Sequence, residues 1–246
     1  MLKIITIITK FILVTLTALL FASCNYSVNL KSIKGSGHVI TENRTVEGDF
    51  KSIEVSNAID LVIEQSEKKE IIVEADDNLQ NSITTKVENG VLIVACEYNS
   101  FIDIESKKVT VKMPIIEELQ ASSASSIRSI NALKGEKISL RSSSASTIDV
   151  KVASENIICK SSSGSSISIK GMALTLEAIA SSGSTINAYE LLTNDVIAKS
   201  SSGSSILIHP IVSLKAKASS GSSITYNITP HTIEKQSSSG GSIDRE

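Results

Sequence analysis

Hydrophobic and polar residues alternate with a period of two along most of the chain after residue 34. The alternation is clearest in five segments whose apolar positions are mostly β-branched, at 52–55, 59–63, 70–74, 91–94 and 109–113. Successive side chains of a strand point to opposite faces, so this pattern predicts half-buried β-strands. Beyond the apolar run at the start of the chain, residues 76–81 could form one helical turn at most. The pattern therefore predicts an all-β protein, with a tight type I′ hairpin at Asn89-Gly90.

A six-residue pattern, Ser-Ser-(Gly/Ala)-(Ser/Gly)-(Ser/Thr)-Ile, occurs seven times in the second half of the chain. Its isoleucines are spaced by 18 to 21 residues, at Ile127, Ile148, Ile167, Ile186, Ile206, Ile224 and Ile243. A fixed period near twenty predicts a stacked repeat, and because the units are strands, each unit is one coil of a parallel β-solenoid. We expect residues 119–246 to form these seven repeats and residues 35–118 to form a half with less regular strands.

Strand parity predicts which side chains fill the interior of each coil. If the repeated isoleucine points inward, the positions ten and eight residues earlier are inward too, and they are apolar in nearly every coil. The serines two and four residues before the isoleucine are then also inward, and their hydroxyls must pair with the backbone or with the next coil. The Gly/Ala position three residues before the isoleucine predicts a bend with positive φ.

The opposite parity predicts the solvent-facing side chains. The position seven residues before each isoleucine is mostly long and polar, and the positions five and one before it are Ser or Thr in every coil. This arrangement predicts one flat, uncharged outer face with rows of hydroxyls. The rows either satisfy the stacked turns structurally or bind a glycan, a polymer or another envelope component. For the second role the candidate binding residues are Thr147, Ser166, Thr185, Ser205 and Ser223.

The composition supports a repetitive structural protein more than an enzyme. Of 246 residues, 44 are Ser and 36 are Ile, whereas aromatic residues make up 3% and Trp is absent. This much β-branched bulk excludes a disordered chain, while most enzymes need a pocket with aromatic and convergent polar groups. The net charge of −2 gives no reason to expect a nucleic-acid partner.

The first residues predict a secretory signal. Lys3 and Lys10 precede or interrupt apolar residues, and an uncharged run at 11–22 ends in Ala22-Ser23-Cys24. The run is short for a membrane span. It resembles a bacterial lipoprotein signal, which implies cleavage after residue 23 and a lipid on Cys24. An ordinary signal peptide with an incidental cysteine, or an uncleaved anchor, remains the alternative. We expect residues 1–23 to be the signal and 24–34 a tether.

Catalytic and metal-binding motifs are missing from the sequence. The histidines, His38, His209 and His231, have no neighbouring Cys, His or acid pair, and no Gly-x-Ser-x-Gly elbow or phosphate-binding glycine loop occurs. The acidic pairs Asp76-Asp77 and Glu117-Glu118 are typical of solvated turns. We therefore expect no catalytic residues, no metal and no cofactor.

The chain from residue 35 to 243 resembles the "putative auto-transporter adhesin, head GIN domain" family. The matching features are Gly35-Ser-Gly37, the segments 44–50, 53–55, 59–63, 75–79 and 89–93, and the Ser-Gly-Ser repeats. The resemblance implies one domain with a right-handed, parallel, β-helix-like solenoid fold. It also implies an envelope lipoprotein, and it adds no catalytic motif.

These observations together predict a non-enzymatic, lipid-anchored envelope protein that acts as an adhesin or scaffold. Its expected partners are a membrane, reached through the N-terminal lipid, and a glycan or an envelope protein; nucleic acid is not expected. The expected location is the outer membrane, on either its periplasmic or its outer side. The alternatives are a carbohydrate-active solenoid enzyme, which needs two acids in one groove, and a surface- or ice-binding solenoid.

Overall fold

The computed structural model describes residues 6, 8–15, 17 and 31–246. The chain divides into two compact units, Met1–Lys31 and Ser32–Glu246. In the first unit the described residues before residue 18 are helical, and they include no helix of the length and apolarity needed for a membrane span. Cys24 and the tether up to residue 30 lie outside the described residues.

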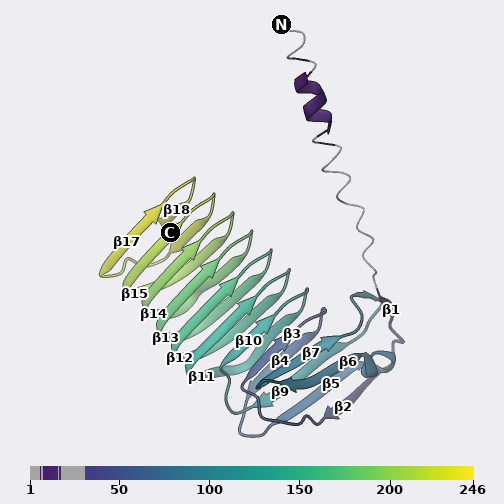
Figure 1. The fold of residues 1–246 in the computed structure, drawn as a ribbon. Helices are drawn as coiled ribbons and strands as arrows, with labels where there is room; N and C mark the ends of the chain where they lie inside the picture. Colours follow the sequence, from purple (N-terminus) through teal and green to yellow (C-terminus); the bar gives the residue numbers. More distant parts are fainter. Residues whose placement is uncertain (1–5, 7, 16, 18–30) are drawn as a thin grey trace. The chain divides into compact units, whose positions relative to one another are not determined.

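The second unit consists of strands and one 3-10 helix, η1 (Figure 1). The elements are β1 (Ser32–Lys34), β2 (Val39–Arg44), β3 (Ser52–Val55), β4 (Asp60–Gln65), β5 (Glu70–Asp76), η1 (Asp77–Ser82), β6 (Ile83–Glu88), β7 (Val91–Cys96), β8 (Ser100–Ile102), β9 (Lys107–Met113), β10 (Glu118–Ala121), β11 (Ser126–Ser142), β12 (Thr147–Ser161), β13 (Ser166–Ala180), β14 (Thr185–Ser200), β15 (Ser205–Ala218), β16 (Ser223–Tyr226), β17 (Thr232–Ser237) and β18 (Ser242–Arg245).

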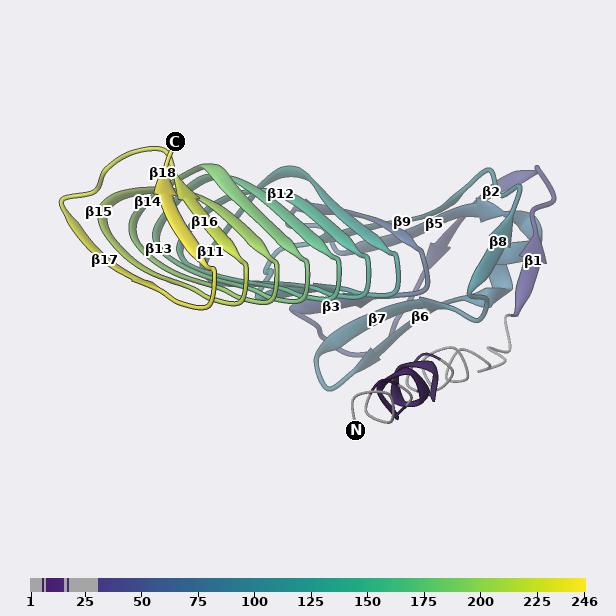
Figure 2. The ribbon, with the colours of Figure 1, turned by 90° about the horizontal axis from the view of Figure 1, so that it is seen from above.

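The predicted solenoid is confirmed. Strands β11 to β15 each form most of one coil and pair in parallel with the next coil, so that the coils lie nested along one axis (Figure 2). The repeated isoleucines are in register from coil to coil; Ile148, for example, is aligned with Ile127 and Ile167. The segments that lead into the turns stack on one another and form one wall of the solenoid. The segments that follow the turns stack in the same way and form a second wall. The two walls of each coil meet at its turn.

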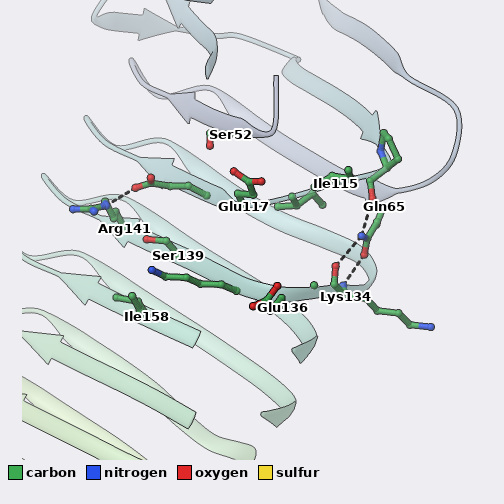
Figure 3. A pocket seen from close by; sticks show the side chains of 14 residues that line it. Ser52, Gln65, Ile115, Glu117, Lys134, Glu136, Ser139, Arg141 and Ile158 are labelled. Atoms are coloured by element: carbon green, nitrogen blue, oxygen red, sulfur yellow. Dashed lines mark hydrogen bonds and ion pairs between the residues drawn. The ribbon is translucent and has the colours of Figure 1, made fainter. Parts of the chain in front are cut away.

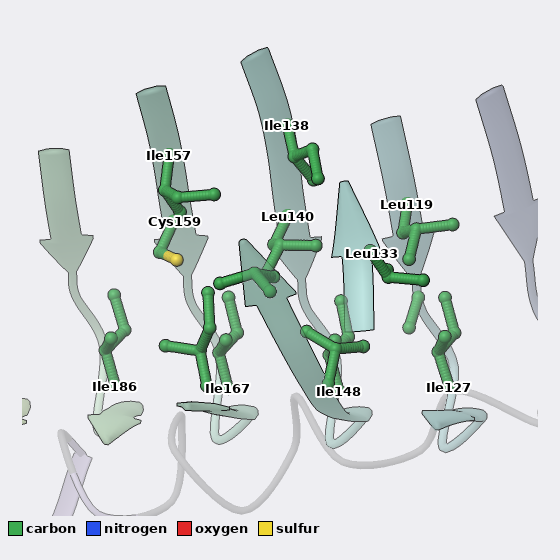
Figure 4. Packing of buried hydrophobic residues seen from close by; sticks show 14 of the residues in the cluster. Leu119, Ile127, Leu133, Ile138, Leu140, Ile148, Ile157, Cys159, Ile167 and Ile186 are labelled. Atoms are coloured by element: carbon green, nitrogen blue, oxygen red, sulfur yellow. The ribbon is translucent and has the colours of Figure 1, made fainter. Parts of the chain in front are cut away.

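The coil interior has the apolar columns that parity predicts. Leu119, Leu140 and Cys159 on one wall point toward Ile127, Ile148 and Ile167 on the other, and all six are at most 1% exposed (Figure 4). The inward residues of the first wall become smaller along the stack, ending in Ala178, Ala198 and Ala216. Cys96 and Cys159 are free buried thiols, and burial raises the pKa of Cys159 to about 12.

The turns correct one prediction about the serines. The serine four residues before each isoleucine, expected inside, is exposed at the tip of the turn with positive φ, for example Ser163 at 55°. The following residue also has positive φ, 68° at Gly164, as both central residues of a type I′ turn do. Parity fails here because a turn is not extended. The serines one and five residues before the isoleucine consequently lie on the two walls that flank the turn and do not share one face.

The inward serine two residues before the isoleucine ties neighbouring coils together. Ser146 Oγ donates to Ala121 O of the preceding coil at 2.8 Å and accepts the Ser143 N–H of its own turn at 3.0 Å. Ser165 makes the same two bonds in the next coil, to Ser142 O and from Ser162 N–H. Buried hydroxyls need partners, and the backbone supplies them, which explains why serine recurs at this position.

The first half of the unit closes one end of the stack with antiparallel strands. β2 and β9 flank β5, and β6 and β7 form the predicted hairpin with φ values of 51° at Asn89 and 78° at Gly90. β3 and β4 belong to the solenoid, because β3 pairs with β10 and β4 pairs with β11. The link between β3 and β4 has positive φ at Asn57 and Ala58, so it is an eighth turn of the same kind. Residues 32–34, expected in the tether, form β1 and pair with β8.

The last coil ends the apolar stack with a lysine. All six residues of β17 are exposed, and Lys235 stands in the column that is otherwise Leu, Cys or Ala. Its Nζ donates to Tyr226 Oη at 2.6 Å and to Ile243 O at 3.2 Å, and it lies 4.5 Å from the centre of the Tyr226 ring. An inward charge at an edge strand discourages the addition of further strands.

Candidate binding surfaces

The five predicted binding residues lie in one row along the wall that follows the turns. This hydroxyl row consists of Ser126, Thr147, Ser166, Thr185, Ser205, Ser223 and Ser242, which are aligned coil by coil. Thr147 is exposed, whereas Ser166, Thr185, Ser205 and Ser223 are half-buried between their neighbours. Two neighbouring pairs are hydrogen-bonded, Ser166 to Thr147 at 3.3 Å and Ser223 to Ser205 at 3.2 Å.

The outward column next to the hydroxyl row is neutral in the central coils. The next outward residues along the strands are Ser168, Asn187, Leu207 and Thr225, and charged residues occur at this position only toward the ends, as Arg128, Asp149 and Asp244. Neighbouring coils of a stack are about 4.8 Å apart. These two columns therefore offer mainly hydroxyl and amide groups at a regular short spacing, and the next outward position carries Lys151 and Lys170.

A second set of hydroxyls forms a ridge at the tips of the turns. These exposed residues are Ser123, Ser144, Ser163, Ser182, Ser202, Ser220 and Ser239, here called the turn ridge. Strand parity missed the ridge because it assigned these serines to the interior. Small residues at two successive central positions are typical of a type I′ turn, and that signal could have placed them.

A groove of about 690 Å³ lies on the other wall, where the two halves of the unit meet (Figure 3). Gln65 at the end of β4 holds one side of it. Its Nε2 donates to Pro114 O and Lys134 O, each at 2.9 Å, and its Oε1 accepts the Lys134 N–H. Asn131, in a bulge of β11, also donates to Gln65 O at 2.8 Å. These bonds fix the loop before β10 against β11.

Charged side chains of both signs line the groove. Glu117 is paired with Lys51 at 2.8 Å and Glu118 with Arg141, whereas Glu136 and Lys137 have no ion-pair partner among the described residues. The hydrogen bond from Lys51 to Glu117 raises the pKa of Lys51. The acidic pair Glu117-Glu118 was expected in a solvated turn. Glu117 lies exposed in the loop before β10, as expected, and both carboxylates are paired with cations, so they do not form a free acid–base pair.

Two sequence signals mark this groove. Glu117 occupies a column that is apolar in the other six repeats, and the first repeat is the longest, with 21 residues between isoleucines. The extra length forms the bulge between Arg128 and Ala132, where the register with β12 shifts. Within residues 31–246 and the described part of the N-terminal helix, no three His, Cys, Asp or Glu side chains are placed to bind a metal.

Residues 49–230 match the family described as "Putative auto-transporter adhesin, head GIN domain". The chain belongs to this family. Among curated proteins, no match is found.

Solved structures from Bacteroides and Parabacteroides species share the fold at low sequence identity. A putative adhesin of Bacteroides fragilis NCTC 9343 has a TM-score of 0.81 at 19% identity, covering 87% of this chain and all of that one. A putative lipid binding protein of Parabacteroides distasonis ATCC 8503 has a TM-score of 0.73 at 20% identity, covering 88% of this chain and all of that one. A putative adhesin of Parabacteroides merdae ATCC 43184 has a TM-score of 0.69 at 21% identity, over 87% of this chain and 99% of that one. At these identities the likeness concerns the fold.

Proposed function

We propose that this protein is a non-enzymatic adhesin or scaffold of the bacterial cell envelope, and that it binds a glycan or an envelope protein through the hydroxyl row. The observation that carries the proposal is the repetition of Ser or Thr at the same outward position in seven aligned coils. The family supports it, as do the names of two solved structures with the same fold.

The structure offers a physical reason to expect binding by repetition. Each hydroxyl contributes about 0.5–1.5 kcal/mol net when it forms a hydrogen bond, so one residue binds weakly and a row of them binds a repetitive partner well. The inward serines already satisfy the turns. The hydroxyl row is not needed for that purpose. Some of its hydroxyls are paired with each other or with Asp60, but a hydroxyl in one hydrogen bond can still accept another from a partner.

We also propose that a lipid on Cys24 anchors the protein to the outer membrane. The apolar run and the Ala22-Ser23-Cys24 ending support this proposal. The acyl chains of a lipoprotein bury many methylene groups at about 0.8 kcal/mol each, which is enough to hold a domain at a membrane.

The test of the hydroxyl row compares single and multiple substitutions in the full chain, purified in a detergent without sugar headgroups. Ser205→Ala should weaken binding to bacterial cells or immobilised glycans only a few-fold, because one hydrogen bond is lost. Replacing Thr147, Ser166, Thr185 and Ser205 together by Glu should abolish binding through charge and bulk. Folding should survive, because these side chains lie on the outer surface and none is fully buried, and circular dichroism checks it.

A matched control places the same four charges on the turn ridge, at Ser144, Ser163, Ser182 and Ser202. These serines belong to the same coils and are exposed. The ridge variant should keep most of the binding. If the hydroxyl-row variant folds and binds like the wild type, the hydroxyl row is structural only and this part of the proposal is wrong.

A further inference from the structure

We propose that the groove at the junction of the two halves is a binding site for a short neutral glycan segment. This site is local, lies on the opposite wall from the hydroxyl row and does not depend on it. Ser52, Glu117, Glu118, Glu136, Ser139 and Ile158 are among its lining residues.

Ser139 is the residue that points to a ligand. It lies in β11 between Glu118 of β10 and Ile158 of β12, so a short side chain stands between two longer ones and leaves a hollow. The residue is 8% exposed, and its Oγ has no hydrogen-bond partner. A buried hydroxyl without a partner is unfavourable. The inward serines of the repeats are all hydrogen-bonded. Ser139 differs from them, and its unpartnered hydroxyl in the wall of a groove fits a site where the ligand supplies the missing hydrogen bond.

The charges in the groove favour a neutral ligand. Glu117 and Glu118 are neutralised by Lys51 and Arg141, and the remaining neighbours, Glu136 and Lys137, carry opposite charges. Lys134 is directed away from the other side chains (Figure 3). Such a site has no net charge to attract an ion, yet it offers carboxylates that accept and cations that donate charge-assisted hydrogen bonds. Sugar hydroxyls both donate and accept.

The apolar part of the groove also fits a sugar better than a peptide. Ile115 is 51% exposed, and it lines the groove together with the half-buried Ile158, which gives two aliphatic surfaces for the C–H face of a sugar ring. A common mode of peptide binding adds an extended peptide to an open strand edge. Here β10 is paired on both sides, with β3 and β11, so no open edge faces the groove.

The experiment exposes the full chain, in a detergent without sugar headgroups, to a printed panel of neutral oligosaccharides, acidic oligosaccharides and short peptides. Titration calorimetry then measures the affinity for the neutral oligosaccharide with the strongest signal. Ser139→Ala should weaken that affinity by up to about tenfold, the upper end of what one hydrogen bond contributes, because the hydroxyl is buried. The same substitution should leave the thermal unfolding midpoint unchanged or raise it, because the hydroxyl has no partner in the free protein. Glu136→Ala, a second variant in the wall, should also weaken binding.

Two controls separate this site from the hydroxyl row. Ser146→Ala removes a buried hydroxyl that is bonded, so it should lower the unfolding midpoint and leave glycan affinity unchanged. The fourfold Glu variant of the hydroxyl row should keep the groove's ligand. Equal affinity of wild type and Ser139→Ala would overturn the proposal for the groove and would not affect the proposal for the hydroxyl row. Capture of only acidic glycans, only peptides or nothing on the panel would overturn the neutral-glycan assignment.

Discussion

At the scale of single residues, Asp76 shows how one buried polar group organises the irregular half. Its carboxylate is 0% exposed and accepts the backbone N–H groups of Gly37, Glu105 and Ser106 at 3.0–3.1 Å. The close approach requires glycine at position 35, where a Cβ would lie 2.5 Å from Asp76 Oδ2. Asp76 thereby joins three segments that are distant in the sequence.

The same residue predicts a pH dependence of stability. Burial raises the pKa of Asp76, but the backbone hydrogen bonds outweigh burial and hold the pKa below its ordinary value. A carboxyl with a lowered pKa in the folded state stabilises the fold above its unfolded pKa of about 4, and this contribution is lost as the pH falls further. Asp76→Asn should therefore lower the free energy of unfolding by about 2–4 kcal/mol at pH 7. The difference from wild type should shrink below pH 4.

Urea unfolding at pH 7, 5 and 3 measures this effect. Asp49→Asn is the control, because the Asp49 side chain is 97% exposed and its loss should not change stability measurably. A difference between Asp76→Asn and wild type that stays constant down to pH 3 would show that the Asp76 charge does not contribute.

At the scale of elements, each coil is a pair of walls joined by a turn that hydrogen-bonds to its neighbours. The turns themselves stack, since the Gly164 N–H donates to Ser182 O and the Gly183 N–H to Ser202 O, each at 3.0–3.1 Å. Repeats of this kind contact mainly their neighbours, so stability is close to a sum of coil and interface contributions. A central coil contributes two interfaces, so a destabilising substitution there should weaken the packing against both neighbouring coils.

The register of a central coil can be tested with two acidic substitutions. Ile186 is 0% exposed and aligned with Ile167 and Ile206, so Ile186→Asp buries a charge without a partner and should cost several kcal/mol. Lys199 is exposed on the outer surface of the same strand and forms only an exposed ion pair with Glu177, so Lys199→Asp should cost less than about 1 kcal/mol. Denaturant melts of both variants give the comparison. A shift for Lys199→Asp as large as that for Ile186→Asp would contradict this assignment of the faces, and a larger one would mean that they are exchanged, as a one-residue slip would do.

At the scale of the whole molecule, the stack separates its chemistry by surface. One wall repeats hydroxyls coil after coil, the turn ridge repeats exposed serines, and the groove occurs once, where the repeat is interrupted. A long partner could use the first surface through many equivalent contacts, whereas the groove suits a short segment.

Membrane attachment is the prediction that belongs to the whole chain. Cys24→Ala should release the protein from the membrane fraction or block its processing, because the lipid is then missing. Cys159→Ala is the matched control and should stay with the membrane, since that thiol is buried in the solenoid. Cell fractionation measures membrane attachment of both variants, and mass spectrometry of the mature N-terminus measures their processing. A Cys24→Ala protein that remains membrane-bound and is processed at the same position would exclude lipidation of Cys24.

The sequence by itself determined the all-β class, the coil period and the inward columns. These features depend on the period-two geometry of an extended chain and on a repeat of constant length, and both are local properties. The hairpin at Asn89-Gly90 has the same origin, because positive φ at two successive residues selects these residue types.

Only the tertiary structure decided the features that depend on turns and on distant segments. The alternation of inward and outward side chains does not continue through a turn, so the sequence placed the turn-ridge serines inside although they are exposed. The eighth turn at Asn57-Ala58 keeps only the first of the repeat's serines, Ser56, and is defined by the pairing of β4 with β11. The groove requires Gln65, Glu117 and Ser139 to meet from three separate segments. Each segment looks ordinary alone, because a hollow and an unpartnered hydroxyl exist only once the neighbouring strands are in place.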